Sequence, residues 1–209
     1  MTKHKVTLSL TKAIQHGWNS TMKYFGFYVT LVLLLVLFTL VPSVFDIFTA
    51  KNSIYSTAIR GIFAALIAIM TLGMVHTTLK TVDNIEPTIM ELFTTHRLLK
   101  YIATSLLYLG MFIGGLALFI VPGIYWGLKY QFSTYLILEK GMTLTEAFEK
   151  SAEMVAGYEW DLLAYWLLML MLNTIGLLLF GVGIIFTLPI TIVGYSYLYK
   201  QLRKIHGWK

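Results

Sequence analysis

Long runs of apolar residues without a charged side chain are the main pattern along the chain. Residues 24–45 and residues 61–79 form two such runs. A helix needs about 20 apolar residues in a row to cross roughly 30 Å of hydrocarbon, because it rises about 1.5 Å per residue. Each run therefore predicts one membrane-spanning helix.

Two further apolar blocks are too long for a single helix. Residues 101–138 contain one charged residue, Lys129, residues 162–199 contain none, and each block is 38 residues long. Turn-forming residues lie near the two middles, at Pro122-Gly123 and at Gly-Val-Gly in residues 181–183. Each block therefore predicts a helical hairpin, which brings the expected number of membrane-spanning helices to six.

The composition agrees with a membrane environment and excludes an ordinary soluble domain. Of the 209 residues, 57% are hydrophobic and 12% are charged, against roughly 45–50% and about 25% in soluble domains. The first apolar run begins only at Tyr24 and is not followed by the small-residue pattern of a signal-peptide cleavage site. We therefore expect no cleavable signal peptide. The absence of cysteine excludes disulfides and thiolate metal sites.

The basic residues are distributed unevenly between the two sides that this topology defines. Thirteen of the 16 Lys and Arg residues fall on one side, Lys51 and Arg60 fall on the other, and Lys129 lies within a span. By the positive-inside rule the richer side is cytoplasmic. We therefore expect both termini in the cytoplasm and the chain in the plasma (inner) membrane. Topology and attraction to anionic lipids explain the net charge of +6, so nucleic acid is not an expected partner.

An internal repeat relates the two long blocks. An offset of 61 residues aligns residues 115–124 with residues 176–185, and six of the ten positions are identical. A Thr-x-x-Glu capping box, which satisfies free N–H groups at a helix start, comes before each hairpin, at Thr88 and at Thr143. An amphipathic pattern begins near Ser9 as well, with these residues on its apolar face: Leu10, Ala13, Ile14, Gly17 and Trp18.

These patterns predict a single all-α membrane domain, a polytopic helix bundle. It would consist of three parallel repeats, each an interfacial amphipathic helix followed by a transmembrane hairpin. The units cover approximately residues 9–81, 87–139 and 143–200. Parallel repeats of this kind occur in some transporters, but they are not a sign of transport by themselves.

Lys129 is the main candidate for a functional residue. It lies about six residues beyond Pro122-Gly123, roughly 9 Å from the expected outer end of its span. A Lys at the membrane centre costs about 2.5–3.5 kcal/mol on insertion scales, so such residues are functional candidates by default. With Gln131 and Asn173 it forms a candidate ligand site. The alternative is structural: Lys129 reaches the outer headgroups, and Asn173 bonds to another helix.

Two small-residue patterns predict close helix packing. Gly110-x-x-x-Gly114 and Gly123-x-x-x-Gly127 allow helix backbones to approach each other. We expect packing within the chain, with a homodimer contact as the alternative. The carboxylates of residues 139–161 follow the solvated face of an amphipathic helix, and no metal or catalytic motif is present. No metal, no cofactor and no enzymatic activity are therefore expected.

A pattern between residues 121 and 151 resembles a known group. A Pro-Gly-Ile turn is followed by a basic residue in the next helix, an acidic residue at its end, and Glu-Ala and Ser on a short helix, here Pro122, Gly123, Lys129, Glu139, Glu146, Ala147 and Ser151. It resembles bacterial and archaeal multi-pass membrane proteins of unknown function, which include the membrane region attached to some glycerophosphodiester phosphodiesterases. The resemblance covers mainly residues 100–199 and implies only an integral-membrane role. This chain leaves no room for the catalytic barrel, so no catalytic residue is carried over.

The expected function is non-enzymatic. We expect a plasma-membrane protein that organises or assists other membrane components, in contact with anionic lipids and either a second copy or another membrane protein. The alternative is a small transporter, or a lipid- or ion-handling protein, with a site between the repeats near Lys129.

The orientation can be tested with a reporter fused after Lys209. We expect a reporter that works only in the cytoplasm to be active there, because an even number of spans returns the C-terminus to the side of the N-terminus. The same reporter inserted between the first two apolar runs serves as the control and is expected to be inactive. An extracytoplasmic C-terminus would contradict the even number of spans.

Overall fold

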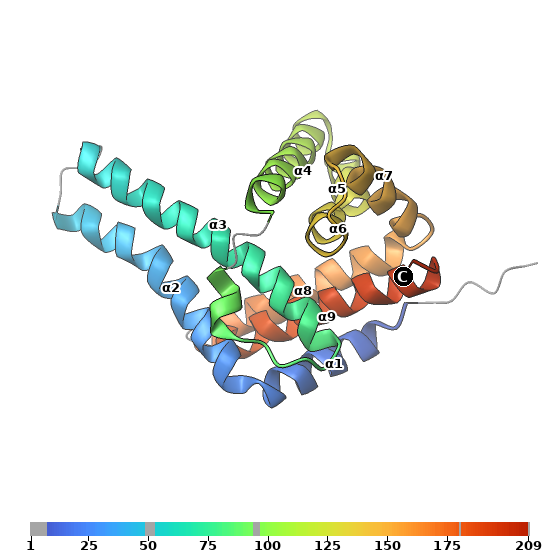
Figure 1. Ribbon diagram of the computed structural model, residues 1–209, viewed down its shortest axis with the longest axis horizontal. Coiled ribbons are helices and arrows are strands. Elements are labelled where there is room, and N and C mark those ends of the chain that lie inside the picture. Colours follow the sequence, from blue (N-terminus) through green and yellow to red (C-terminus); the bar gives the residue numbers. More distant parts are fainter. Residues whose placement is uncertain (1–7, 49–52, 94–96, 180, 209) are drawn as a thin grey trace, which may run out of the picture.

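The structure is a computed structural model that describes residues 8–48, 53–93, 97–179 and 181–208. All regular secondary structure in these segments is helical (Figure 1). Four helices are long and apolar enough to cross a membrane, which indicates a membrane protein. They are α2 (Phe25–Phe48), α3 (Ile54–Val82), α4 (Leu98–Leu118) and α8 (Glu159–Leu178).

The other two expected spans have a different form. Instead of one helix, α5 (Ile120–Tyr130) and α6 (Ser133–Lys140) follow α4, with 11 and 8 residues. Each is shorter than the roughly 20 residues that a span needs. The last helix, α9 (Ile184–Ile205), has 22 residues but is not among the four apolar ones. Its Tyr, Ser and Thr residues and its basic last turn lower its hydropathy.

One hairpin reverses where expected and the other reverses earlier. Between α8 and α9, Gly181 has a φ of 75°, which glycine adopts without strain. Between α4 and α5 the reversal is at Phe119, which is extended with φ −161° and ψ 149°, and not at Pro122-Gly123. Pro122 lies in the first turn of α5, where a missing N–H removes no helical bond.

The three expected amphipathic helices differ in length. The first and the last are α1 (Leu10–Lys23), with 14 residues, and α7 (Leu144–Val155), with 12. At the second position, after Thr88, there is only η1 (Ile89–Phe93), a 3-10 helix of five residues. The Glu91 carboxylate pairs there with Lys80, 2.6 Å away, so it does not return to the backbone as a capping box requires.

α1 lies along α9 and runs antiparallel to it (Figure 1). A Cβ added to Gly17 would overlap the carbonyl oxygen of Ile190, and one added to Gly194 would approach the carbonyl of Ala13 at 2.9 Å. Small residues thus allow the two backbones to touch. Of the apolar face expected for α1, Ala13 and Gly17 are buried, whereas Trp18 is 53% exposed.

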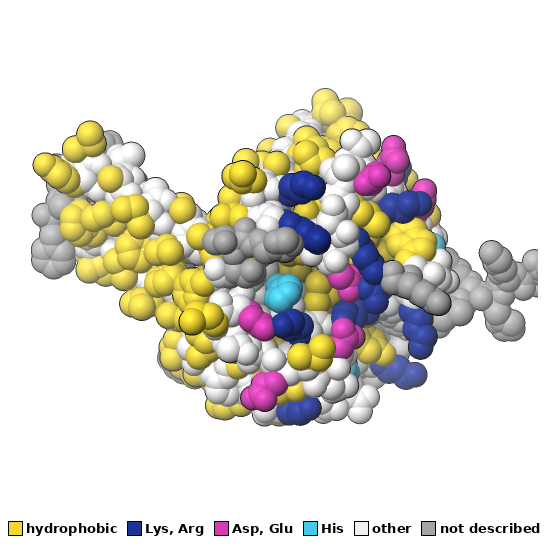
Figure 2. All heavy atoms as spheres, in the orientation of Figure 1, with side chains coloured by type: hydrophobic (Ala, Val, Ile, Leu, Met, Phe, Trp, Pro, Cys, Tyr) yellow, Lys and Arg dark blue, Asp and Glu magenta, His cyan; other side chains and the backbone are white. Residues whose placement is uncertain are grey.

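The molecule consists of a helical body and a projecting hairpin (Figure 1). The body has its main core between α1, α3, α5, α6, α7, α8 and α9. A smaller cluster around Leu31 and Met70 joins α2 and α3 to the start of α9. Beyond that cluster, residues 39–48 and 53–65 extend away from the body; we call them the α2–α3 arm. Figure 2 shows apolar side chains covering the arm, whereas Lys, Arg, Asp and Glu gather over the body on the face in view.

The contact between α1 and α9 can be tested with glycine substitutions. Gly17→Ala is expected to destabilise the protein by about 1–3 kcal/mol, because the added methyl group meets backbone and not a flexible side chain. Gly61→Ala is the control, since its Cβ would have nothing within 4 Å. Thermal unfolding in detergent measures both. An unchanged midpoint for Gly17→Ala would contradict the close approach.

Candidate functional site

The break between α5 and α6 is the central polar feature of the body. Gln131 and Phe132 separate the two helices, and Phe132 has φ −96° and ψ 3°, outside the helical region. Neither Pro nor Gly occurs between residues 128 and 134. Local sequence therefore does not explain the break, and the explanation has to come from tertiary contacts.

Side chains satisfy the carbonyl groups that the end of α5 leaves without helical partners. The last four carbonyls of any helix lack such partners. The Tyr108 hydroxyl donates to the carbonyl of Gly127 at 3.0 Å, and the Gln131 amide nitrogen donates to the carbonyl of Leu128 at 2.9 Å. Two of the four acceptors are thus occupied, one of them by a residue of α4.

Ser151 of α7 connects both sides of the break. Its hydroxyl donates to the carbonyl of Lys129 at 3.0 Å and accepts from the backbone N–H of Phe132 at 3.1 Å. The Ser133 hydroxyl donates to the remaining carbonyl, that of Tyr130, at 2.8 Å. Since Ser151, Phe132 and Ser133 are all 0% exposed, no water replaces these bonds easily.

Gln131 and Asn173, predicted as ligand residues, serve as links between helices. The side-chain oxygen of Gln131 accepts from the indole N–H of Trp166 at 2.8 Å and from the hydroxyl of Tyr195 at 2.6 Å. Asn173 donates to the Thr191 hydroxyl at 3.0 Å, joining α8 to α9. These contacts fit the structural alternative, and they do not bring the two side chains together with Lys129.

Lys129 lies in the last turn of α5. The partial negative charge at this end of a helix stabilises a cation. Its separation from the observed turn at Phe119 is about 15 Å along the helix, more than the expected 9 Å. The ammonium nitrogen is 5.6 Å from the ring centre of Tyr125 and 5.7 Å from that of Tyr130, within cation–π range. Lys129 thus lies farther from the turn before its helix than the sequence predicted.

A groove of about 550 Å³ opens at Lys129 between α4, α5 and α7. We call it the Lys129 groove. Its lining combines apolar side chains with three charged ones, Lys129, Glu149 and Glu153. The apolar lining includes Leu107 and Met111 of α4. Three other pockets of the described residues are smaller, at about 380, 210 and 190 Å³.

The capping box predicted at Thr143 fixes the start of α7. The Thr143 backbone N–H donates to the Glu146 carboxylate at 3.0 Å, and the Glu146 N–H donates to the Thr143 hydroxyl at 3.4 Å. The bond from the Thr143 backbone lowers the pKa of Glu146. The Glu146 carboxylate is therefore part of the cap. Because the cap fixes where α7 begins, it also fixes the positions of Ser151 and of the groove residues along this helix.

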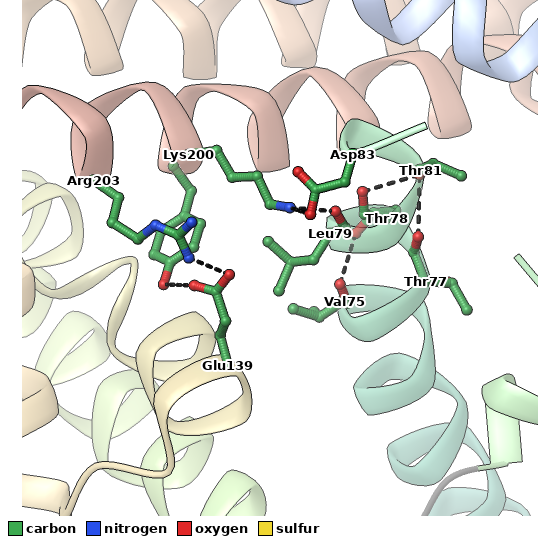
Figure 3. Close-up of polar contacts among 10 residues, drawn as sticks. Val75, Thr77, Thr78, Leu79, Thr81, Asp83, Glu139, Lys200 and Arg203 are labelled. Atoms are coloured by element: carbon green, nitrogen blue, oxygen red, sulfur yellow. Dashed lines mark hydrogen bonds and ion pairs between the residues drawn. The ribbon is translucent and has the colours of Figure 1, made fainter. Parts of the chain in front are cut away.

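A second polar cluster lies where α3, α6 and α9 meet (Figure 3). Glu139 accepts from the Tyr199 hydroxyl at 2.7 Å and pairs with Arg203. Lys200 pairs with Asp83 of the α3 C-cap. Opposite charges thus hold the ends of three helices together.

The predicted packing glycines divide into two groups. A Cβ on Gly123 would meet the backbone nitrogen of Leu116 at 2.5 Å, and one on Gly127 would meet the Phe112 ring at 2.7 Å. Both glycines thus lie at the contact of α4 and α5. Gly110 and Gly114 have no described atom within 4 Å of an added Cβ.

The sequence analysis named Gln131 and Ser151 for other reasons, and it did not identify the aromatic donors around the break. Tyr108, Trp166 and Tyr195 are ordinary members of apolar helices in the sequence. A role for Ser151 could have been predicted from the sequence, because it is a polar residue on the buried face of α7, between Phe148 and Met154.

The comparisons with known proteins give distant relatives without a described function. An uncharacterized protein of Mycobacterium bovis and two of Mycobacterium tuberculosis are 28% identical over 139 residues, 66% of this chain. The match covers 42% of the length of each relative, so the chain corresponds to less than half of them. No protein-family model and no solved structure matches the chain.

The role of Ser151 can be tested by removing its hydroxyl. Ser151→Ala is expected to cost about 1–3 kcal/mol, because the buried N–H of Phe132 and the carbonyl of Lys129 lose their partner. Ser43→Ala is the control, since that hydroxyl bonds only within exposed α2, at 3.5 Å. Chemical denaturation in detergent measures the difference. Equal effects of the two substitutions would contradict a special role for Ser151.

Proposed function

We propose that this chain is a non-enzymatic integral protein of the plasma membrane that organises or assists another membrane component. It spans the membrane six times as three related units, with both termini in the cytoplasm. The partner is a transmembrane helix of another protein or of a second copy, and it packs against the α2–α3 arm.

The break between α5 and α6 is compatible with a fifth and a sixth span. Non-helical backbone is tolerated within hydrocarbon when protein groups satisfy it, and the end of α5 meets this condition through Tyr108, Gln131, Ser151 and Ser133. The α5–α6 segment then crosses with α9 beside it. The cluster of Glu139, Lys200 and Arg203 lies at the cytoplasmic end in this arrangement.

The observation that carries the proposal is the uncovered surface of the arm. Apolar side chains of both arm helices are exposed, for example Leu40 at 54% and Ile62 at 59%. At the tip the helices are held together by the Arg60–Asp46 ion pair and by the Ser56 hydroxyl, which donates to Asp46 at 2.6 Å. The arm is thus internally joined but covered by no other described element along its length.

Small residues on the arm side of α3 favour a helix as the partner. Gly61 and Ala65 are exposed and four residues apart, and a Cβ on Gly61 would have nothing within 4 Å. Small residues at this spacing let a second helix backbone approach within a membrane, where dispersion contacts drive association. A flexible lipid chain would not pack against these small residues as specifically as a helix does.

The partner can be sought with a photo-crosslinking residue placed at Ala65 in the cell membrane. We expect one discrete protein adduct, because a helix packed on α3 stays within reach. The same residue placed at Leu178, 76% exposed on α8, serves as the control and is expected to give lipid adducts only. Lipid adducts alone at both positions would contradict an organising role through the arm.

Lipid handling is a second candidate function, favoured by the Lys129 groove. Gln131 and Asn173 do not belong to it, because their side chains are bonded to Trp166, Tyr195 and Thr191. The candidate site therefore consists of Lys129 with the groove residues of α4 and α7.

A further inference from the structure

We infer that the Lys129 groove binds a phospholipid whose headgroup carries both a phosphate and a primary ammonium group. The inference rests on lipid handling, the second candidate function above, and assigns the chemistry of its ligand. It does not depend on the partner of the α2–α3 arm.

The apolar part of the groove suits an acyl chain. Leu107 and Met111 of α4 form one wall, and Leu144 and Phe148 of α7 form another. Leu107 is 49% exposed and Leu106 beside it is 64% exposed, so the groove is continuous with the outer surface of α4. Because α4 is one of the four candidate spans, that surface faces lipid, and an acyl chain can enter the groove sideways.

Lys129 supplies the contact for a phosphate. None of the ion pairs of the described residues includes Lys129. The neighbours of its ammonium group are the rings of Tyr125 and Tyr130. A lysine held by aromatic faces and without a counter-ion is costly in an apolar setting. A phosphate oxygen provides the missing negative charge through a charge-assisted hydrogen bond.

Glu149 and Glu153 supply the contacts for an ammonium group. They are four residues apart on α7, so they lie on the same helix face, and both line the groove. Glu153 also pairs with Lys150 at 2.6 Å, whereas Glu149 has no ion-pair partner among the described residues. Glu149 is thus the carboxylate available to a ligand.

The charges of the groove favour a zwitterionic headgroup over a purely anionic one. Because Lys150 pairs with Glu153, Lys129 and Glu149 remain as one positive and one negative charge. A headgroup with only a phosphate would gain from Lys129 but leave Glu149 without a partner. A headgroup with both charges satisfies both ends, and the volume of about 550 Å³ lies within the usual range for ligand sites, about 300–1,000 Å³.

The test is competition between two lipids that differ in the ammonium group. The purified full chain is equilibrated in micelles with equimolar phosphatidylethanolamine and phosphatidylglycerol of the same acyl chains, and retained lipids are counted by native mass spectrometry. We expect the retained phosphatidylethanolamine to exceed the retained phosphatidylglycerol by roughly tenfold, because one charge-assisted hydrogen bond changes an affinity by about that factor.

Two variants assign the contacts. Glu149→Gln is expected to reduce the preference to about equal retention, by losing the ammonium contact, while Lys129→Met lowers retention of both lipids. Lys12→Met and Glu86→Gln are matched controls, because both residues are exposed outside the groove. Glu149 is exposed, so its substitution leaves the fold intact and keeps the test decisive even if Lys129→Met fails to fold.

The possible outcomes distinguish the headgroup assignment from lipid handling in general. Equal retention of the two lipids by the unchanged protein, with loss in Lys129→Met, would overturn the headgroup assignment and leave lipid handling in place. Retention of neither lipid above the level of the detergent exchange control would overturn both. A preference that persists in Glu149→Gln would also overturn the assignment.

Discussion

The four carbonyl groups at the end of α5 are the constraint on which the body of the molecule depends. An unpaired carbonyl in an apolar interior costs several kcal/mol. α5 can therefore end at Tyr130 only if hydrogen-bond donors are available for its last carbonyl groups. They come from α4 through Tyr108, from α7 through Ser151, from the break itself through Gln131, and from the start of α6 through Ser133. The position of the break therefore sets the positions of α4 and α7 against α5.

The other features of the body follow from that arrangement. Gln131, turned inward at the break, gathers Trp166 of α8 and Tyr195 of α9 around one oxygen. α7 is held against α5 by Ser151, and this contact brings its carboxylates to the same groove as Lys129. The groove thus holds charges of both signs, which is the property on which the inferred zwitterionic ligand rests.

The parts that sequence could predict are those that depend on nearby residues. Uninterrupted apolar runs gave the long helices α2, α3, α4 and α8, and the Thr143 capping box gave the start of α7, because both are local patterns. The break in α5–α6 could not be predicted, since its donors lie 19 residues away, at Ser151 from Phe132, and 64 residues away, at Tyr195 from Gln131. The 3-10 turn after Thr88 was missed for the same reason: Lys80 takes the carboxylate that the cap needed.

Solid-state NMR of the protein in lipid bilayers, with labelled Phe and Ser, tests the broken helix most directly. The account predicts non-helical backbone shifts at Phe132, in line with its ψ of 3°, and a cross-peak between Phe132 and Ser151. Helical shifts that continue from Ile120 through Lys140, without that cross-peak, would contradict it.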